Sequence, residues 1–328
     1  MLAHDSCGAD FSGYDFDEDG KVDWVVILYA GYGEASGAPS NTIWPHQYEL
    51  SYSYPDMSFN LDGKTVDHYC CLNELDYSTK KRDGIGTFCH EFSHVMGLPD
   101  FYSTNNGTHH TLCDWDIMDY GPYNNNSNTP PCYSAYERWF MGWITPRVLT
   151  DPEFVTLHPL NDSKEALLMC EGDVHNMDGI NPSPKEFYLI ENRTQTGWDK
   201  YLPGKGMLLT KIKYNRSKWA QNTVNNTQSN MGVDIIEAKP NTTTGIQAYG
   251  KSTDAYPRGA TKYTGFEGHE ITEIMLEDNN DITFVYRDGW PQAIDAVKDG
   301  RKVSKYIENG RLIIVHDGQK FDILGNRL

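Results

Sequence analysis

The sequence of 328 residues has no long apolar run and comparatively few basic residues. No segment approaches the ~20 consecutive apolar residues that cross a bilayer, so we expect no transmembrane helix. The chain carries 28 Lys and Arg residues against 46 Asp and Glu, a formal net charge of −18. Proteins that bind phosphate backbones need a basic surface, so this balance argues against nucleic acid as a partner. With 38% hydrophobic and 12% aromatic residues, the chain has enough apolar side chains for a packed core.

Cysteine pairs spaced for a structural zinc site are also missing. The seven cysteines include no Cys-x-x-Cys pair, which argues against a zinc knuckle. Cys113 and Cys132 flank one loop-rich segment and are candidates for a disulfide. The alternative, that all seven are reduced and buried small apolar residues, is equally consistent with the sequence.

The first residues lack the pattern of a secretory signal peptide. No basic segment followed by an apolar stretch occurs within residues 1–20, and the longest early apolar run is Val25 to Ala30. The pattern is typical either of a cytoplasmic protein or of a sequence that begins within a longer precursor.

The pattern of secondary structure changes near residue 150, and the length suits about two domains. Residues 1–150 mix helix and strand patterns, whereas residues 151–289 show short strand-like runs between turn residues, typical of an all-β sandwich-like domain. In residues 290–328, Asn309-Gly310 and Asp317-Gly318 separate strand-like runs and predict a short three-stranded meander. We therefore expect domains at 1–150 and 151–289, followed by the meander.

A helix is predicted over Asp83 to Met96, with Asp83 as its N-cap. Gly97 and Pro99 follow it, and both residue types end helices. Apolar residues recur every three or four positions along the predicted helix, at Ile85, Phe88, Phe92 and Met96.

This predicted helix carries the motif His90-Glu91-Phe92-Ser93-His94. Positions four apart share a helix face, so His90 and His94 point the same way and can bind one Zn²⁺. Glu91 lies beside the open coordination position, where the general base for a zinc-bound water belongs. Asp100, six residues after His94, offers an oxygen ligand. The alternative is a surface helix whose histidines align by chance; its amphipathic pattern and the turn at Gly97 argue against this.

Several separate segments resemble the immune inhibitor A family of bacterial secreted metallopeptidases, relatives of the metzincins. The run GTFCHEFSHVMGLPDFY resembles that family's active-site helix, DWDIMDYGPY its Met-turn, and YSAYERWFMGW the helix that follows. Upstream, the segment that begins DFSGYDFDEDG is similar to the strand entering the catalytic domain, and FYLIENRTQTGWDKYLPGKGMLL is similar to the start of a β-rich second domain. The resemblance implies an α+β fold: a metzincin-like zinc protease domain of twisted sheet plus active-site helix, then an all-β sandwich-like domain.

The resemblance also implies a role for each matching residue. His90 and His94 are expected to be zinc ligands, and Glu91 the catalytic base. Met118 is expected to be the Met-turn residue beneath the metal. Tyr120 lies where some metzincins place a tyrosine near the zinc, and we expect it to act in catalysis.

The third zinc ligand has two candidates. In the family's extended motif the position of Asp100 supplies this ligand, although most metzincins use histidine there. Glu137, on the helix after the Met-turn, is the alternative, because some zinc proteases take a glutamate from a downstream helix. Asp100 is favoured because Gly97 and Pro99 present it within one short turn.

A second candidate metal site precedes the first predicted strand. The spacing of the acidic residues from Asp15 to Asp23 matches the first nine positions of an EF-hand loop. At the twelfth position, however, Val26 stands in place of glutamate. We expect a structural calcium site with another ligand donor, and the alternative is a solvated acidic turn. The expected calcium ligands are Asp15, Asp17, Asp19 and Asp23.

Together these patterns predict a secreted or cell-surface bacterial zinc endopeptidase that hydrolyses peptide bonds of proteins, with Zn²⁺ and structural Ca²⁺ as metals and a monomer favoured. In metzincin-like folds an edge strand pairs with an extended substrate, and we expect the strand-like run Val66 to Leu72 to be that edge. The resemblance further implies that a first strand and helix are missing ahead of Asp10, and that residues 308–328 resemble C-terminal sorting or anchoring segments. Two alternatives stay open: an inactive, protease-derived binding or adhesion protein, and a zinc amidase or other hydrolase of non-peptide substrates.

Overall fold

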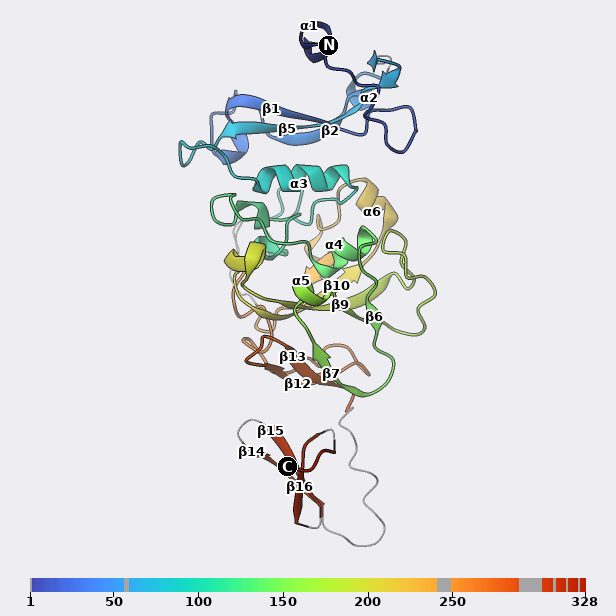
Figure 1. Ribbon diagram of the computed structural model, residues 1–328, viewed down its shortest axis with the longest axis vertical. Helices are drawn as coiled ribbons and strands as arrows, with labels where there is room; N and C mark the ends of the chain where they lie inside the picture. Colours follow the sequence, from blue (N-terminus) through green and yellow to red (C-terminus); the bar gives the residue numbers. More distant parts are fainter. Residues whose placement is uncertain are drawn as a thin grey trace.

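The structure is a computed structural model that describes residues 2–55, 59–240, 249–288, 303–308, 311–316, 318–323 and 325–328. Within this part the fold mixes α and β structure, with more strands than helices (Figure 1). None of the helices described there is both long and apolar enough to span a bilayer. The predicted turn residues Asn309, Gly310 and Asp317 lie outside the described residues.

A three-stranded sheet with the order β1-β5-β2 forms the N-terminal layer, at the top of Figure 1. β1 (Val25–Tyr32) runs parallel to β5 (His68–Leu75), and β2 (His46–Glu49) pairs with β5 in the antiparallel direction. Shorter elements accompany this sheet: α1 (Leu2–Cys7), the 3₁₀ turn η1 (Glu34–Ser36), α2 (Leu50–Ser53), β3 (Asn60–Leu61) and β4 (Lys64–Thr65).

The expectation that Val66 to Leu72 forms the sheet edge is wrong, because β5 lies in the centre of this sheet. Four consecutive residues of β5, from Cys70 to Asn73, are buried. A strand covered on both faces has no polar alternation, and this is the pattern of a central strand. The antiparallel edge is β2, and no other strand of the described residues pairs with it.

The helix α3 (Gly86–Val95) lies beneath this sheet, against β5 and β2 (Figure 1). It begins three residues later than predicted, with Ile85 rather than Asp83 at the N-cap position. The Asp83 carboxylate instead accepts a hydrogen bond from Asn73 Nδ2 at 2.7 Å. The Gly86 N–H donates to the Ser127 carbonyl oxygen at 2.7 Å, and this contact with a distant segment takes the place of a helical hydrogen bond before Gly86.

Two glycines set the ends of α3. A Cβ on Gly86 would lie 1.8 Å from the Pro122 carbonyl oxygen, so only glycine lets the start of the helix approach this backbone. Gly97 has φ of 94°, the left-handed conformation that ends the helix where the sequence predicts. The chain then turns back toward the helix.

Two β-sheets follow along the chain, in the middle of Figure 1. One has five strands in the order β11-β10-β9-β8-β6, and its neighbours are antiparallel except for the parallel pair β6–β8. The other has three antiparallel strands in the order β12-β13-β7. Their bounds are β6 (Arg147–Val148), β7 (Glu153–Leu157), β8 (Leu167–Met169), β9 (Glu186–Arg193), β10 (Gly206–Lys213), β11 (Val233–Ile235), β12 (Ile271–Leu276) and β13 (Ile282–Tyr286). The connections hold short helical elements: η2 (Cys113–Trp115), η3 (Gly121–Tyr123), α4 (Ala135–Phe140), α5 (Leu160–Ser163), η4 (Gly197–Tyr201), α6 (Arg216–Ala220) and η5 (Gln228–Asn230).

Two hydrophobic cores form on alternate residues of the central strands. Tyr188 and Ile190 of β9 pack in a core shared with the three-stranded sheet. Phe187 and Leu189 pack in another core, with Met118 and the residues of α4. Alternation follows from the two-residue period of a strand. Because the second core contains residues from both sides of position 150, the domain boundary at that position stays a prediction.

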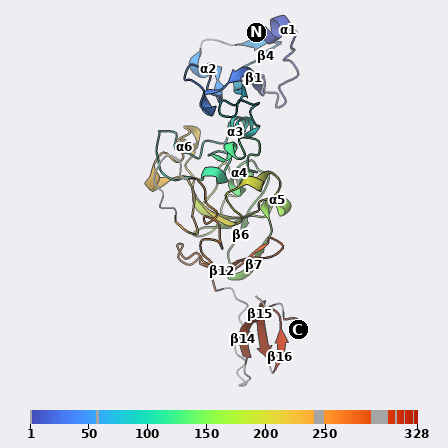
Figure 2. The same cartoon turned by 90° about the vertical axis from the view of Figure 1, so that its left-hand side faces the viewer.

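Near the C-terminus, three strands form a separate antiparallel sheet, at the bottom of Figure 2. They are β14 (Val303–Glu308), β15 (Arg311–His316) and β16 (Gln319–Phe321).

None of the seven cysteines forms a disulfide. Of the two readings that the sequence left open, the pairing of Cys113 with Cys132 is therefore wrong. Cys113 is buried and Cys132 half-buried, whereas Cys7 is exposed.

Candidate active site

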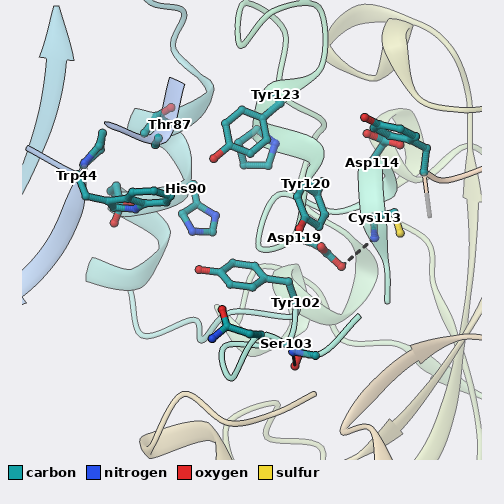
Figure 3. A pocket seen from close by; sticks show the side chains of 17 residues that line it. Trp44, Thr87, His90, Tyr102, Ser103, Cys113, Asp114, Asp119, Tyr120 and Tyr123 are labelled. Carbon is teal, nitrogen blue, oxygen red and sulfur yellow. Dashed lines mark hydrogen bonds between the residues drawn. The ribbon is translucent and has the colours of Figure 1, made fainter. Parts of the chain in front are cut away.

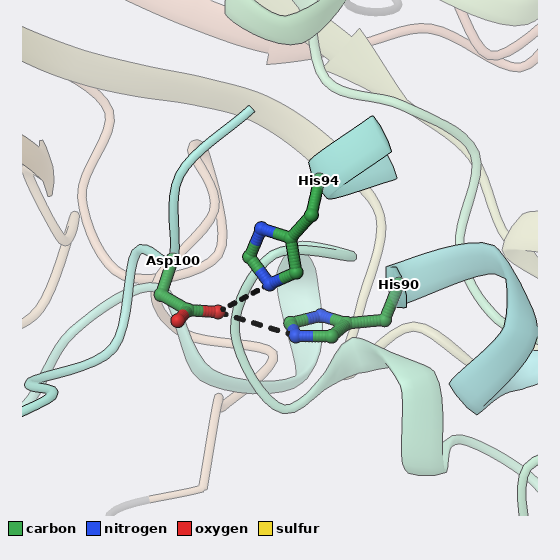
Figure 4. Close-up of side chains that lie close together, drawn as sticks. All are labelled: His90, His94 and Asp100. Atoms are coloured by element: carbon green, nitrogen blue, oxygen red, sulfur yellow. Dashed lines mark ion pairs between the residues drawn. The ribbon is translucent and has the colours of Figure 1, made fainter. Parts of the chain in front are cut away.

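Three predicted zinc ligands converge below α3 (Figure 4). α3 presents His90 and His94 on one face, and the turn after Gly97 brings Asp100 to them. The Nε2 atoms of His90 and His94 each lie 3.2 Å from Asp100 Oδ1. The three donor atoms all lie within 4.8 Å of one another, close enough to share a single ion.

Both imidazole rings are oriented by backbone carbonyl groups. His90 Nδ1 lies 2.8 Å from the Ile117 carbonyl oxygen, and His94 Nδ1 lies 2.8 Å from that of Leu98. With Nδ1 of each ring donating to these carbonyls, Nε2 of each ring faces Asp100 and is the nitrogen open to a metal once its proton is displaced. This arrangement selects the tautomer that binds a metal.

The Asp100 carboxylate is oriented by a residue from the second half of the chain. Asn222 Nδ2 donates to Asp100 Oδ2 at 2.6 Å, and the Asp100 backbone N–H donates to Asn222 Oδ1 at 2.6 Å. Two bonds between the same two residues hold the plane of the carboxylate. Nothing in the local sequence around the motif indicates this partner, which lies 122 residues away.

The charges at this cluster fit a zinc ion. Asp100 is 4% exposed, and its Oδ1 accepts no hydrogen bond within the described part of the chain. Burial opposes the ionised form, yet the two histidines hold the pKa of Asp100 far below its ordinary value. Burial also opposes a charge on His90, yet Asp100 raises its pKa to about 9. Two nitrogens and one carboxylate oxygen form the three-ligand set of catalytic zinc sites, which leave a fourth position open.

Glu137, the alternative third ligand, lies elsewhere and has another structural role. Its Oε2 accepts hydrogen bonds from the Ser134 backbone N–H at 2.6 Å and from Ser134 Oγ at 2.9 Å. Together with the bond from the Glu137 N–H to Ser134 Oγ, these form a capping box at the start of α4. Burial, and next the charge of neighbouring Asp116, raise the pKa of Glu137 well above its ordinary value. The pattern Ser-x-x-Glu in the sequence could have indicated this role.

A cavity of about 610 Å³ opens beside the candidate ligands His90, His94 and Asp100 (Figure 3). His90 and Glu91 line it, and both are buried. Trp44 and Pro45, which directly precede the edge strand β2, also line it. The predicted base and the sheet edge therefore face one common space.

Tyrosines line the cavity, and Tyr102 lies nearer to the candidate ligand His90 than Tyr120 does. The Tyr102 ring stacks on His90 with 6.3 Å between ring centroids, and Tyr120 follows at 6.4 Å from Tyr102. In Figure 3 the hydroxyl groups of Tyr102 and Tyr123 point toward His90. Burial, and next the Asp100 carboxylate, raise the pKa of Tyr102, so its hydroxyl keeps its proton. Tyr102 was not predicted from the sequence, although it lies only two residues beyond a candidate ligand.

Comparison with known proteins identifies the family that the N-terminal part of the chain resembles. Residues 4–144 match the family model described as the immune inhibitor A peptidase M6 catalytic domain. Over these residues the chain is similar to the M6 peptidase family. The resemblance predicted from the sequence is thereby confirmed for residues 4–144.

Two kinds of curated relative are similar to part of this chain. The pre-pro-metalloprotease PrtV of two Vibrio cholerae strains is 26% identical over 197 residues, which cover 53% of this chain and 21% of the relative. Immune inhibitor A of Bacillus thuringiensis subsp. alesti is 27% identical over 132 residues, which cover 37% of this chain and 19% of the relative. The chain thus spans about a fifth of the length of these relatives.

Met118 lies within the segment that matches the M6 family model, between the Asp100 loop and His90. Its side chain is completely buried, and its carbonyl oxygen accepts a hydrogen bond from the Phe101 N–H at 2.8 Å. The preceding residue, Ile117, supplies the carbonyl that orients His90. The turn around Met118 therefore contacts both the loop that carries Asp100 and the His90 ring.

The acidic loop before β1, within the matched segment, brings three of its four predicted calcium ligands together. Carboxylate oxygens of Asp15, Asp17 and Asp19 lie within 4.8 Å of one another. Asp23 instead accepts a hydrogen bond from the Phe16 N–H at 2.9 Å. Lys64 Nζ lies 2.6 Å from Asp15 Oδ2, so a cation at this cluster has to displace an existing ion pair.

Proposed function

We propose that this protein is a zinc-dependent endopeptidase that hydrolyses peptide bonds of proteins. The observation that carries the proposal is the convergence of His90, His94 and Asp100 beside the buried Glu91, within a segment of the M6 family. The relatives named as metalloprotease and immune inhibitor A support the same activity. Asp100, rather than Glu137, is the third ligand in this proposal.

The roles of the residues follow from their positions around the cavity. Zinc, when bound, polarises the scissile carbonyl and lowers the pKa of a water molecule. Glu91 accepts a proton from the attacking water and delivers it to the leaving amine. Met118 supplies an apolar floor under the ligands. A tyrosine hydroxyl donates to the oxygen on which negative charge develops; the sequence predicts Tyr120, and Tyr102 is nearer to His90.

An extended substrate is proposed to add to β2 rather than to β5. β2 has a free edge among the described strands, and Trp44 and Pro45 connect that edge to the cavity. Main-chain hydrogen bonds along such an edge bind a peptide with little dependence on its sequence.

The finer fold and the setting of the protein are also proposals. We infer a metzincin-like domain at 1–150 and a β-sandwich-like domain at 151–289, supported by the two sheets that share one core. Export to the cell surface or medium and a sorting role for the C-terminal meander follow from the resemblance, and of the possible oligomeric states a monomer is favoured. Structural calcium at Asp15, Asp17 and Asp19 is a further proposal; if EGTA leaves the Tm unchanged, it is wrong.

The test is cleavage of fluorescent casein by the wild type and by Glu91→Ala, each with and without a zinc chelator. Wild-type cleavage that disappears in the variant and in the chelated sample supports the proposal, provided that the variant still binds zinc. Cleavage by Glu91→Ala at the wild-type rate contradicts the role of Glu91. If the wild type cleaves nothing, the absence of bound zinc favours the alternative of an inactive binding protein, whereas bound zinc indicates a latent enzyme.

A further inference from the structure

The cavity beside His90 has two aspartate carboxylates at its far end (Figure 3). His90 lies at one end of it, and Asp114 and Asp119 lie at the other. Asp119 is 2% exposed, and its Oδ2 accepts a hydrogen bond from the Cys113 N–H at 2.8 Å. Its Oδ1 is buried and accepts no hydrogen bond of ordinary length from the described residues. Burial raises the pKa of Asp119 to about 7, although Thr111 lies close enough to favour the ionised form. A buried carboxylate oxygen without a donor is unfavourable, so this end of the cavity is suited to a ligand that brings one.

The cavity wall is largely aromatic, and among its described residues the one basic side chain is His90, at the metal-binding end. No Lys or Arg is found among the described residues that line it. Aromatic faces attract cations through the negative charge of the ring face, in particular where water is excluded. The net charge of −18 adds a field that attracts basic substrates. The aromatic wall consists of Trp44, Tyr102, Tyr120, Tyr123 and Tyr249.

We propose that this cavity binds a basic side chain, Arg or Lys, of a substrate residue that flanks the scissile bond, with Asp119 and Asp114 as its charge partners. The inference rests on the proposed peptidase function and names the specificity of the same site. A guanidinium or ammonium group donates to Asp119 Oδ1 while its alkyl stem packs along the tyrosine rings. An aromatic substrate side chain fills the same volume but leaves Oδ1 without a donor.

The first experiment maps cleavage sites. The zinc-loaded chain of 328 residues digests a denatured protein mixture, and mass spectrometry identifies the new termini. Arg and Lys are expected to be enriched at one position flanking the cleaved bond. A peptide cleaved at such a site is then compared with its citrulline analogue, which keeps the shape of arginine and removes the charge. We expect kcat/KM to favour arginine by at least about tenfold.

The second experiment assigns the preference to the cavity. Asp119→Asn is expected to reduce the arginine-to-citrulline ratio of kcat/KM toward 1. Asp173→Asn, which removes an exposed carboxylate that does not line the cavity, is expected to keep the wild-type ratio. Because Asp119 also accepts from the Cys113 N–H, the Tm of the variant is measured, and Asp114→Asn replaces it if the fold is lost.

The outcomes separate this inference from the proposed function. Cleavage without enrichment of basic residues, or a wild-type ratio near 1, overturns the inference and leaves the peptidase function intact. A high ratio that is retained by whichever cavity variant keeps its fold also overturns it. No cleavage of any substrate by the zinc-loaded wild type overturns the proposed function, and this inference with it.

Discussion

Replacing Asn222 with alanine is expected to weaken zinc binding about 10- to 100-fold, the usual effect of losing a residue that orients a metal ligand. Asn222 exchanges two hydrogen bonds of 2.6 Å with Asp100, one of them to the carboxylate. A hydrogen bond to a charged group contributes about 1.5–3 kcal/mol, and 1.4 kcal/mol corresponds to a tenfold change in affinity. At this rate, the loss of one such hydrogen bond corresponds to about a 10- to 100-fold loss of affinity, which agrees with the first figure. The physical reason is that a carboxylate free to rotate presents Oδ1 to the metal for only part of the time.

The measurement is a competition between the metal-free protein and a chromophoric zinc chelator. Asn226→Ala is the matched control, because Asn226 Oδ1 accepts from the Thr104 N–H at 2.7 Å on the same loop but does not contact Asp100. We expect the control to keep its zinc affinity within about threefold. Asn222→Asp is expected to bind zinc more weakly than Asn222→Ala near neutral pH, since it places a second carboxylate against Asp100.

One result refutes this reasoning. If Asn222→Ala binds zinc as tightly as the wild type while its metal-free form keeps the wild-type Tm, the turn after Gly97 positions Asp100 without help. A fall in Tm for both Asn222→Ala and Asn226→Ala, with equal losses of zinc affinity, shows instead a general role in holding the loop.

Two further predictions concern the tyrosines and a buried carboxyl pair. Tyr102→Phe is expected to lower kcat by about 10²-fold with little change in KM, whereas Tyr120→Phe changes kcat by less than about threefold, because Tyr102 lies against His90; the reverse order in single-turnover rates contradicts this. Burial raises the pKa of Asp116 to about 6, beside Glu137, Glu191 and Arg193. A carboxyl whose folded pKa exceeds its ordinary value near 4 is most stabilising below pH 4, and that contribution is lost as the pH rises through 6. Asp116→Asn is therefore expected to lose less Tm than the wild type between pH 5 and pH 7.5, and parallel curves for the two proteins contradict the assignment.

The ligand cluster was predictable from sequence because its geometry is local. Residues four apart on a helix share a face, and a glycine with φ of 94° reverses the chain three residues before Asp100. Asn222 was not predictable, because no periodic pattern connects positions 122 residues apart. The start of α3 shows a similar limit, since Asp83 is a good N-cap by residue type but its side chain bonds Asn73. The central position of β5 likewise depends on which strands pair with it.

The shared core has a consequence for how this protein can be divided. The M6 match ends at residue 144, yet Leu98, Phe101 and Met118 pack against residues of β9 and β10 beyond that point. A fragment that stops at the end of the match therefore exposes an apolar surface and lacks the amide that holds Asp100. Exchange of this segment between proteins, in the laboratory or in evolution, requires the β-rich partner to move with it. The unit that sequence comparison recognises is thus smaller than the unit that can be inherited in working form.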